Sequence, residues 1–208
     1  RVQHTQNLIN KNQYGSNYDK FLPPASYKLT YQASNGRGVY SFCMCPGGYV
    51  VNASSEEGLL AVNGMSYSKR DGKNANSAII ISVTPKDFSG QGPLSGVEFQ
   101  RQIEKKAYEA GNGKIPVQYY KDFKGKSEHT GNIPESFVPA MKGDFTFAEV
   151  NQILPKELNI SFVQGMEHFH KIIPGFAENA SKVRFLSGNI IWRNFSQKES
   201  MRFFFMLH

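Results

Sequence analysis

One stretch constrains the fold more than any other, because it joins two apolar runs through a tight turn. It is Tyr40-Ser-Phe-Cys-Met-Cys-Pro-Gly-Gly-Tyr-Val-Val-Asn-Ala-Ser54. Apolar runs on both sides of a Pro-Gly-Gly turn are typical of a β-hairpin. The glycines mark backbone that takes a positive φ or lies so close to another group that a Cβ would clash. The stretch therefore predicts a hairpin over 39–53, in which Cys43 and Cys45 point to the same face.

The charge and the apolar content exclude two classes of partner. The formal net charge is +7, but the lysines are scattered and do not alternate with aromatic residues as in nucleic-acid-binding modules. We expect a cationic surface suited to an anionic ligand or partner domain, and no nucleic acid. The sequence has no apolar run long enough for a membrane helix, so no membrane partner is expected.

The two cysteines do not form a disulfide framework, because a bridge across a single intervening residue would be strained. Both thiols are therefore expected to be reduced and the protein to be cytoplasmic. The first residue is Arg1 rather than methionine, which we interpret as the start of a piece of a longer protein.

Secondary-structure signals divide the chain into a strand-rich part, 23–85, and a helix-rich part, 95–176. Strands are expected at 26–33, 39–44, 49–53, 59–62 and 77–84, with a polar loop over 66–76. Helices are expected at 5–14, at 99–111 and at 147–154, with the strongest apolar stripe at Leu158, Phe162, Met166, Phe169 and Ile173. An extended segment is expected at 114–123 and a mobile loop at 125–134. This order predicts an α+β fold in which helices pack on an antiparallel or mixed β-sheet.

Several chemical motifs are absent. No Gly-x-Gly-x-x-Gly follows a strand, no phosphate-binding P-loop is present, and Gly36-Arg-Gly38 is only a short turn, so this chain alone is not expected to bind FAD or NAD tightly. His168 and His170 diverge around a helix and are interpreted as surface residues. Cys43 and Cys45 lack the spacing of a structural zinc site, and no metal is expected.

From the residues alone, the cysteine- and glycine-rich stretch has two interpretations. Cysteine and methionine are often buried, so the stretch can be ordinary core. Alternatively, the thiols and glycines form a wall against a flat ligand. The residues do not decide between the two.

The motif and its flanks resemble a known family. The segment Gly38 to Glu57, with Asn63-Gly-Met-Ser66 and Arg70, is similar to bacterial FAD-dependent dehydrogenases, often labelled NAD- or FAD-utilising. Flanking segments agree, among them Arg1-Val-Gln-His4, Gln13-Tyr-Gly15, Val97-Glu-Phe-Gln100, Lys114-Ile-Pro-Val-Gln118 and Lys171-Ile-Ile-Pro-Gly-Phe176. The likeness extends to Leu186-Ser-Gly188, and residues 189–208 depart from it.

The resemblance implies that residues 1–188 are a substrate or cap domain beside a separate FAD-binding domain of the same parent protein. That domain and a small-molecule substrate would be the partners, FAD would be the parent's cofactor, and the isolated chain would be inactive. The cofactor- or substrate-facing residues implied are Cys43, Cys45, Pro46, Gly47, Gly48, Asn63, Gly64, Met65, Ser66 and Arg70. No catalytic residue is assigned.

Two other functions remain open at this point. The chain can be a non-catalytic binding or interaction module without flavin activity, or a thiol or metal enzyme that uses Cys43 and Cys45. The substrate/cap domain of a flavoprotein oxidoreductase is the favoured hypothesis.

Overall fold

The computed structural model describes residues 1–19, 21–88, 92–125 and 139–177, together with the backbone of three short strands at 182–183, 190–191 and 203–207. The first part contains β1 (Val2–Thr5), α1 (Gln6–Tyr14), β2 (Thr30–Gln32), β3 (Gly38–Cys45), β4 (Gly48–Asn52), β5 (Val62–Ser66), β6 (Asn74–Val83) and a 3₁₀ turn, η1 (Pro85–Asp87). The second part contains α2 (Ser95–Gly111), β7 (Ile115–Val117), α3 (Tyr120–Lys124), β8 (Met141–Lys142), β9 (Phe145–Phe147), η2 (Val150–Gln152), α4 (Lys156–Ile172), β10 (Lys182–Val183), β11 (Ile190–Ile191) and β12 (Phe203–Leu207).

The main sheet is organised around β6. β6 pairs antiparallel with β3 along one edge and with β1 and then β12 along the other. Its run Ala78-Ile-Ile-Ile-Ser-Val83 is rich in residues branched at Cβ, which favour a strand, and it is buried along nearly its whole length. The most apolar strand therefore becomes the centre of the sheet.

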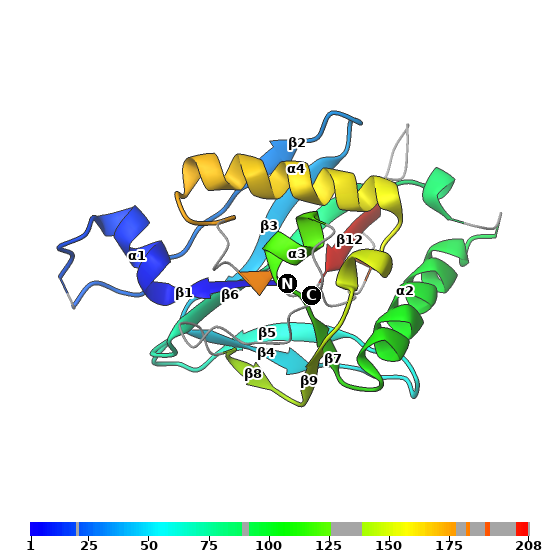
Figure 1. The fold of residues 1–208 in the computed structure, drawn as a ribbon, viewed down its shortest axis with the longest axis horizontal. Helices are drawn as coiled ribbons and strands as arrows, with labels where there is room; N and C mark the ends of the chain where they lie inside the picture. The colour runs from blue at the N-terminus through cyan, green and yellow to red at the C-terminus, as the bar shows by residue number, and fades with distance from the viewer. Residues whose placement is uncertain are drawn as a thin grey trace.

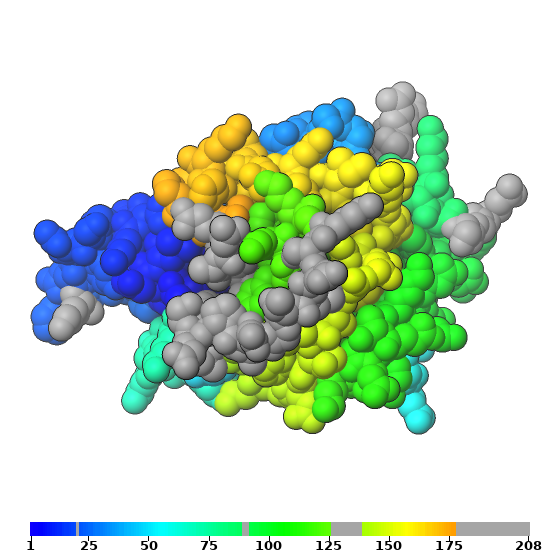
Figure 2. All heavy atoms as spheres, viewed as in Figure 1, coloured from blue at the N-terminus to red at the C-terminus, as the bar shows by residue number. Residues whose placement is uncertain are grey.

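Two smaller sheets lie beside the main one. β4 pairs antiparallel with β5 and parallel with β8, and β7 pairs parallel with β9. Figure 1 shows α4 along one side of the molecule and β4, β5 and β8 along the other, with the N-terminus between them. Figure 2 shows the α1 region projecting at one end of the molecule and α2 lying toward the other.

The stripe of α4 forms the centre of the core, as predicted. Its members Leu158, Phe162, Met166 and Phe169, together with Ile173, which directly follows α4, are all buried. They share one apolar cluster with Val39 of β3 and with Ile79 and Ile81 of β6. A Cβ on Gly165 would lie 2.5 Å from Val39 Cγ1, so this glycine lets α4 pack closely on β3.

The structure confirms the α+β class, and it confirms three of the predicted helices. Thr5 caps α1 by accepting a hydrogen bond from Leu8 N at 3.2 Å. In α2 the predicted spacing of Phe99, Ile103 and Ala107 forms the buried face. None of the helices among the described residues is long and apolar enough to cross a membrane.

The predicted β-hairpin over 39–53 is wrong. β3 pairs with β2 and β6 in the main sheet, whereas β4 pairs with β5 and β8 in the small sheet. Pro46 and Gly47 therefore form a corner at which the chain passes from one sheet to another. The turn residues do specify a change of direction, but the choice of partner strand depends on residues distant in sequence, such as β6.

Other boundaries differ for similar reasons. The strand expected over 26–33 shortens to β2, and that over 59–62 begins only at Val62 and continues to Ser66 as β5. β6 begins at Asn74, inside the loop expected over 66–76. The expected helix over 147–154 is the 3₁₀ turn η2, since Phe147 is held in β9, and the extended segment over 114–123 ends in α3. The loop expected at 125–134 and most of segment 189–208 lie outside the described residues.

Candidate functional site

The ten residues singled out in the sequence gather around the corner between β3 and β4. Cys43, Cys45, Pro46, Gly47 and Gly48 form the corner itself. Asn63, Gly64, Met65 and Ser66 form most of β5, which pairs directly with β4, and Arg70 lies in the turn that follows. We call this group the sheet corner.

The glycines of the sheet corner are required by contacts within the chain. Gly47 has φ +54°, and a Cβ there would overlap the backbone carbonyl of Arg70. A Cβ on Gly48 would lie 2.6 Å from Met65 O and 2.7 Å from Cys45 O. The space that a Cβ would occupy at these glycines is therefore filled by the protein's own backbone.

Two side chains hold the corner in place. The backbone N–H of Gly47 donates to Gln6 Oε1 at 2.8 Å, and Ser66 Oγ donates to the Pro46 carbonyl at 2.7 Å. Pro46, Gly47 and Gly48 are all buried. Because these polar groups are already bonded within the chain, the corner is not a vacant cradle for a phosphate.

Arg1 is the residue that organises the site. Its side chain lies between the main sheet and the small sheet, and the residue is only 2% exposed. Its Nε donates to Asn76 Oδ1 at 2.7 Å, and its Nη2 donates to the Cys43 carbonyl. A Cβ on Gly64 would overlap this guanidinium, so the glycine of Asn63-Gly-Met-Ser66 leaves room for Arg1.

Burial disfavours the charged form of this guanidinium and lowers the pKa of Arg1. The nearby Cys45 thiol opposes that shift. The sequence gives no signal that Arg1, the residue just before β1, is buried, because arginine is usually exposed.

The two thiols differ in exposure, contrary to the same-face prediction. Between Phe42 and Cys45, β3 advances by three residues, whereas its partner strand β6 advances by only two, from Ala78 to Asn76. This β-bulge interrupts the regular alternation of side chains between the two faces of the sheet. Cys43 has φ +43° within this bulge and is exposed, whereas Cys45 is half-buried. Burial raises the pKa of the Cys45 thiol, and the Arg1 guanidinium opposes that shift.

Three members of the group offer side chains to solvent. Cys43, Asn63 and Arg70 are exposed. Asn63 Oδ1 accepts from Gly64 N at 2.8 Å, and Arg70 has φ +50°. Met65 is half-buried opposite Tyr49. The exposed side chains of the sheet corner are thus a thiol, an amide and a cation.

The two helical histidines have structural contacts, and both are more exposed than the core stripe beside them. His168 stacks on Tyr31 with ring centroids 4.6 Å apart. His170 Nδ1 accepts hydrogen bonds from the backbone N–H groups of Gly175 and Ala177 at 3.2 and 3.3 Å. His170 therefore stabilises the chain just after α4.

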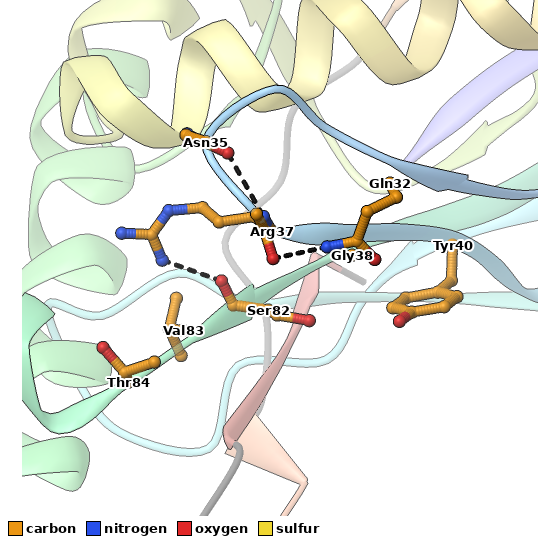
Figure 3. A pocket seen from close by; sticks show the side chains of 9 residues that line it. Gln32, Asn35, Arg37, Gly38, Tyr40, Ser82, Val83 and Thr84 are labelled. Atoms are coloured by element: carbon orange, nitrogen blue, oxygen red, sulfur yellow. Dashed lines mark hydrogen bonds between the residues drawn. The ribbon is translucent and has the colours of Figure 1, made fainter.

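A hollow of about 480 Å³ lies away from the sheet corner, between the β2–β3 turn and the end of β6 (Figure 3). Gln32, Asn35, Arg37, Tyr40, Ser82 and Thr84 line it. Arg37 Nη1 donates to the Ser82 carbonyl at 2.8 Å and to Asp87 Oδ2 at 2.9 Å. Because Asp87 neutralises this cation, the hollow has no strong preference for an anion.

Comparison with known proteins identifies what the chain is similar to. Residues 1–185 match the protein family described as "FAD-dependent protein, C-terminal domain-like". A Clostridium beijerinckii protein, named "Uncharacterized protein", is 47% identical over 181 residues. The match covers 85% of this chain but 34% of that relative, so the chain spans about a third of the relative's length.

Proposed function

The chain belongs to the family of FAD-dependent protein C-terminal domains, and from this membership we propose that it is the substrate or cap domain of an FAD-dependent oxidoreductase. The observation that carries the proposal is that the family match includes the whole sheet corner, whose ten residues converge from β3, β4, β5 and the turn after β5. In this proposal the outward side of the corner covers the flavin, excludes water and selects a small-molecule substrate.

The described residues fit a wall beside the cofactor better than a cradle around it. The N–H of Gly47 is bonded to Gln6, and the space above Gly47 is filled by the Arg70 carbonyl. A pyrophosphate needs free backbone N–H groups at a helix N-terminus or in a nest, and the corner does not offer them. We propose that the FAD-binding domain of the parent supplies the phosphate site, and that the flavin, when bound, carries the electrons of the reaction.

The exposed side chains of the corner have distinct roles in this proposal. Arg70 supplies a positive charge for an anionic substrate or a flavin phosphate. Asn63 and Cys43 offer further short polar contacts. We also propose a cytoplasmic location, because half-buried and exposed free thiols are typical of proteins kept in a reducing compartment.

A first test measures cofactor binding by each part of the protein. We expect the full-length parent to be yellow, with a flavin absorbance spectrum, and calorimetric titration of FAD into residues 1–208 alone to show no micromolar binding. A colourless parent would favour the non-catalytic interaction module instead. Tight FAD binding by residues 1–208 would show that the phosphate site had been placed in the wrong domain.

A second test examines the outward side of the corner. In the full-length parent, Arg70→Glu should weaken FAD affinity by about tenfold or more, as expected for loss of a charge-assisted contact. Lys69→Glu is the matched control, because Lys69 is an exposed cation next to Arg70. Equal losses in the two variants would mean that only the general surface charge matters and that Arg70 does not face the cofactor.

A further inference from the structure

The bulge at the end of β3 brings two thiols into an unusual arrangement. Cys45 Sγ turns back toward residue 43 and donates to the Cys43 carbonyl at 3.3 Å. Cys43 has φ +43° at the same point, a conformation that is uncommon for residues other than glycine, asparagine and aspartate. Both residues are free thiols.

The bulge also changes whether the two thiols can be bridged. In a regular strand, Cα atoms two residues apart are separated by about 6.8 Å. That separation lies at the upper end of the range that a disulfide spans. The bulge between Phe42 and Cys45 interrupts this extended path, and Cys45 Sγ lies 3.3 Å from the carbonyl oxygen of Cys43. A bridge over one residue remains strained, and strained or exposed bridges are the ones that are readily reduced.

A buried cation lies beside the inner thiol. Arg1 Nη2 is 3.5 Å from Cys45 Sγ, and the same nitrogen donates to the Cys43 carbonyl. Arg1 is fixed on its other side by Asn76. Reactive cysteines typically lie in partly exposed places beside a cationic group. Cys45 is half-buried beside Arg1, and the guanidinium opposes the rise in thiol pKa that burial causes.

We propose that Cys43 and Cys45 form a thiol–disulfide redox pair that exchanges two electrons with small disulfides and dithiols. Cys43, the exposed thiol, is the entry residue. Cys45, held beside Arg1, is the resolving residue. This inference concerns the chain's own thiols and does not depend on the flavin proposal.

The reaction runs in two balanced steps. Cys43 loses its proton and attacks one sulfur of an external disulfide R–S–S–R. The external S–S bond breaks and one R–SH leaves, so that a mixed disulfide remains on Cys43. Cys45 then loses its proton and attacks the Cys43 sulfur, which releases the second R–SH and forms the Cys43–Cys45 bridge. The pair is oxidised by two electrons, and the external disulfide is reduced to two thiols.

The test uses residues 1–208 and glutathione as the probe. The reduced chain is incubated in buffers with a rising fraction of oxidised glutathione, quenched with acid, alkylated with N-ethylmaleimide and weighed intact by mass spectrometry. The wild-type chain should become two hydrogen atoms lighter and lose both alkylation sites. Adding dithiothreitol should restore both sites.

Single variants assign the two roles. Cys45→Ser should accumulate one glutathione adduct on Cys43, because the resolving thiol is absent. Cys43→Ser should form its adduct about tenfold more slowly, because Cys45 is less accessible. Circular dichroism of both variants verifies that the fold is retained. The proposal is overturned if the wild-type chain carries stable glutathione adducts instead of a bridge, or if it stays reduced while Cys45→Ser is modified.

Discussion

Replacing Gly64 by alanine tests whether Arg1 locks the two sheets together. Gly64 lies within β5, and a glycine in a strand is usually less stable than alanine by about 0.5–1 kcal/mol. The substitution should therefore be neutral or stabilising if space were free. A Cβ at this position, however, would overlap the Arg1 guanidinium and Asn76 Oδ1, so we expect the opposite sign.

The magnitude follows from the bonds that Arg1 would lose. To make room, the guanidinium must leave both Asn76 Oδ1 and the Cys43 carbonyl. A hydrogen bond to a charged group contributes about 1.5–3 kcal/mol. Loss of two such bonds, less the strand preference for alanine, gives an expected destabilisation of about 2–5 kcal/mol.

Urea unfolding of residues 1–208, followed by far-ultraviolet circular dichroism, measures this loss. Gly92→Ala is the matched control, because no atom of the described residues lies within 4 Å of a Cβ at that position. The control should stay within about 0.5 kcal/mol of the wild type. If Gly64→Ala were as stable as the control, Arg1 would be free to move, and its role at the sheet corner would be refuted.

Three further predictions concern the core, a helix cap and a buried histidine. Phe162→Ala should lower the free energy of unfolding by about 3–5 kcal/mol. Ile160→Ala, at a side chain that is 44% exposed, should lower it far less. Equal losses of stability in urea titrations would contradict the assigned core face of α4. Thr5→Ala should cost about 1 kcal/mol through loss of the cap on α1, and an unchanged urea midpoint would argue against that cap. Burial lowers the pKa of His4 from 6.5 to about 4. At a pH between those two values, His4 therefore binds a proton in the unfolded chain but not in the folded chain. Stability should therefore fall by about 3 kcal/mol as the pH drops from 7 to 4; the step should vanish in His4→Gln, and its persistence there would assign it to other groups.

The helices were predictable because their signals are local. The stripe from Leu158 to Ile173 repeats at helical spacing, and Thr5 marks the start of α1 with a side chain that can cap it. In both cases the residues that determine the structure are neighbours along the chain. The same holds for β6, whose branched residues favour a strand whatever they pair with.

The sheet corner was predicted as a group of residues but not as a geometry. Nothing near Pro46 distinguishes a hairpin from a crossing between two sheets, because β3 pairs with β6 some forty residues later along the sequence. Arg1 was missed for the same reason. Its partners are the Cys43 carbonyl and Asn76, and its burial depends on Gly64, a residue that by itself predicts only flexibility.

The crossing at Pro46 also has a consequence for how the chain folds. β3 and β4 do not pair with each other, although they are neighbours along the chain. β1 has no partner among the described residues before β6, since Val2 pairs with Ser77. Contacts between residues so distant in sequence slow folding, because a long loop must close before they are gained. During synthesis, β1 would leave the ribosome well before β6, and we expect its exposed edge to depend on chaperones or on rapid translation until residues 74–83 emerge.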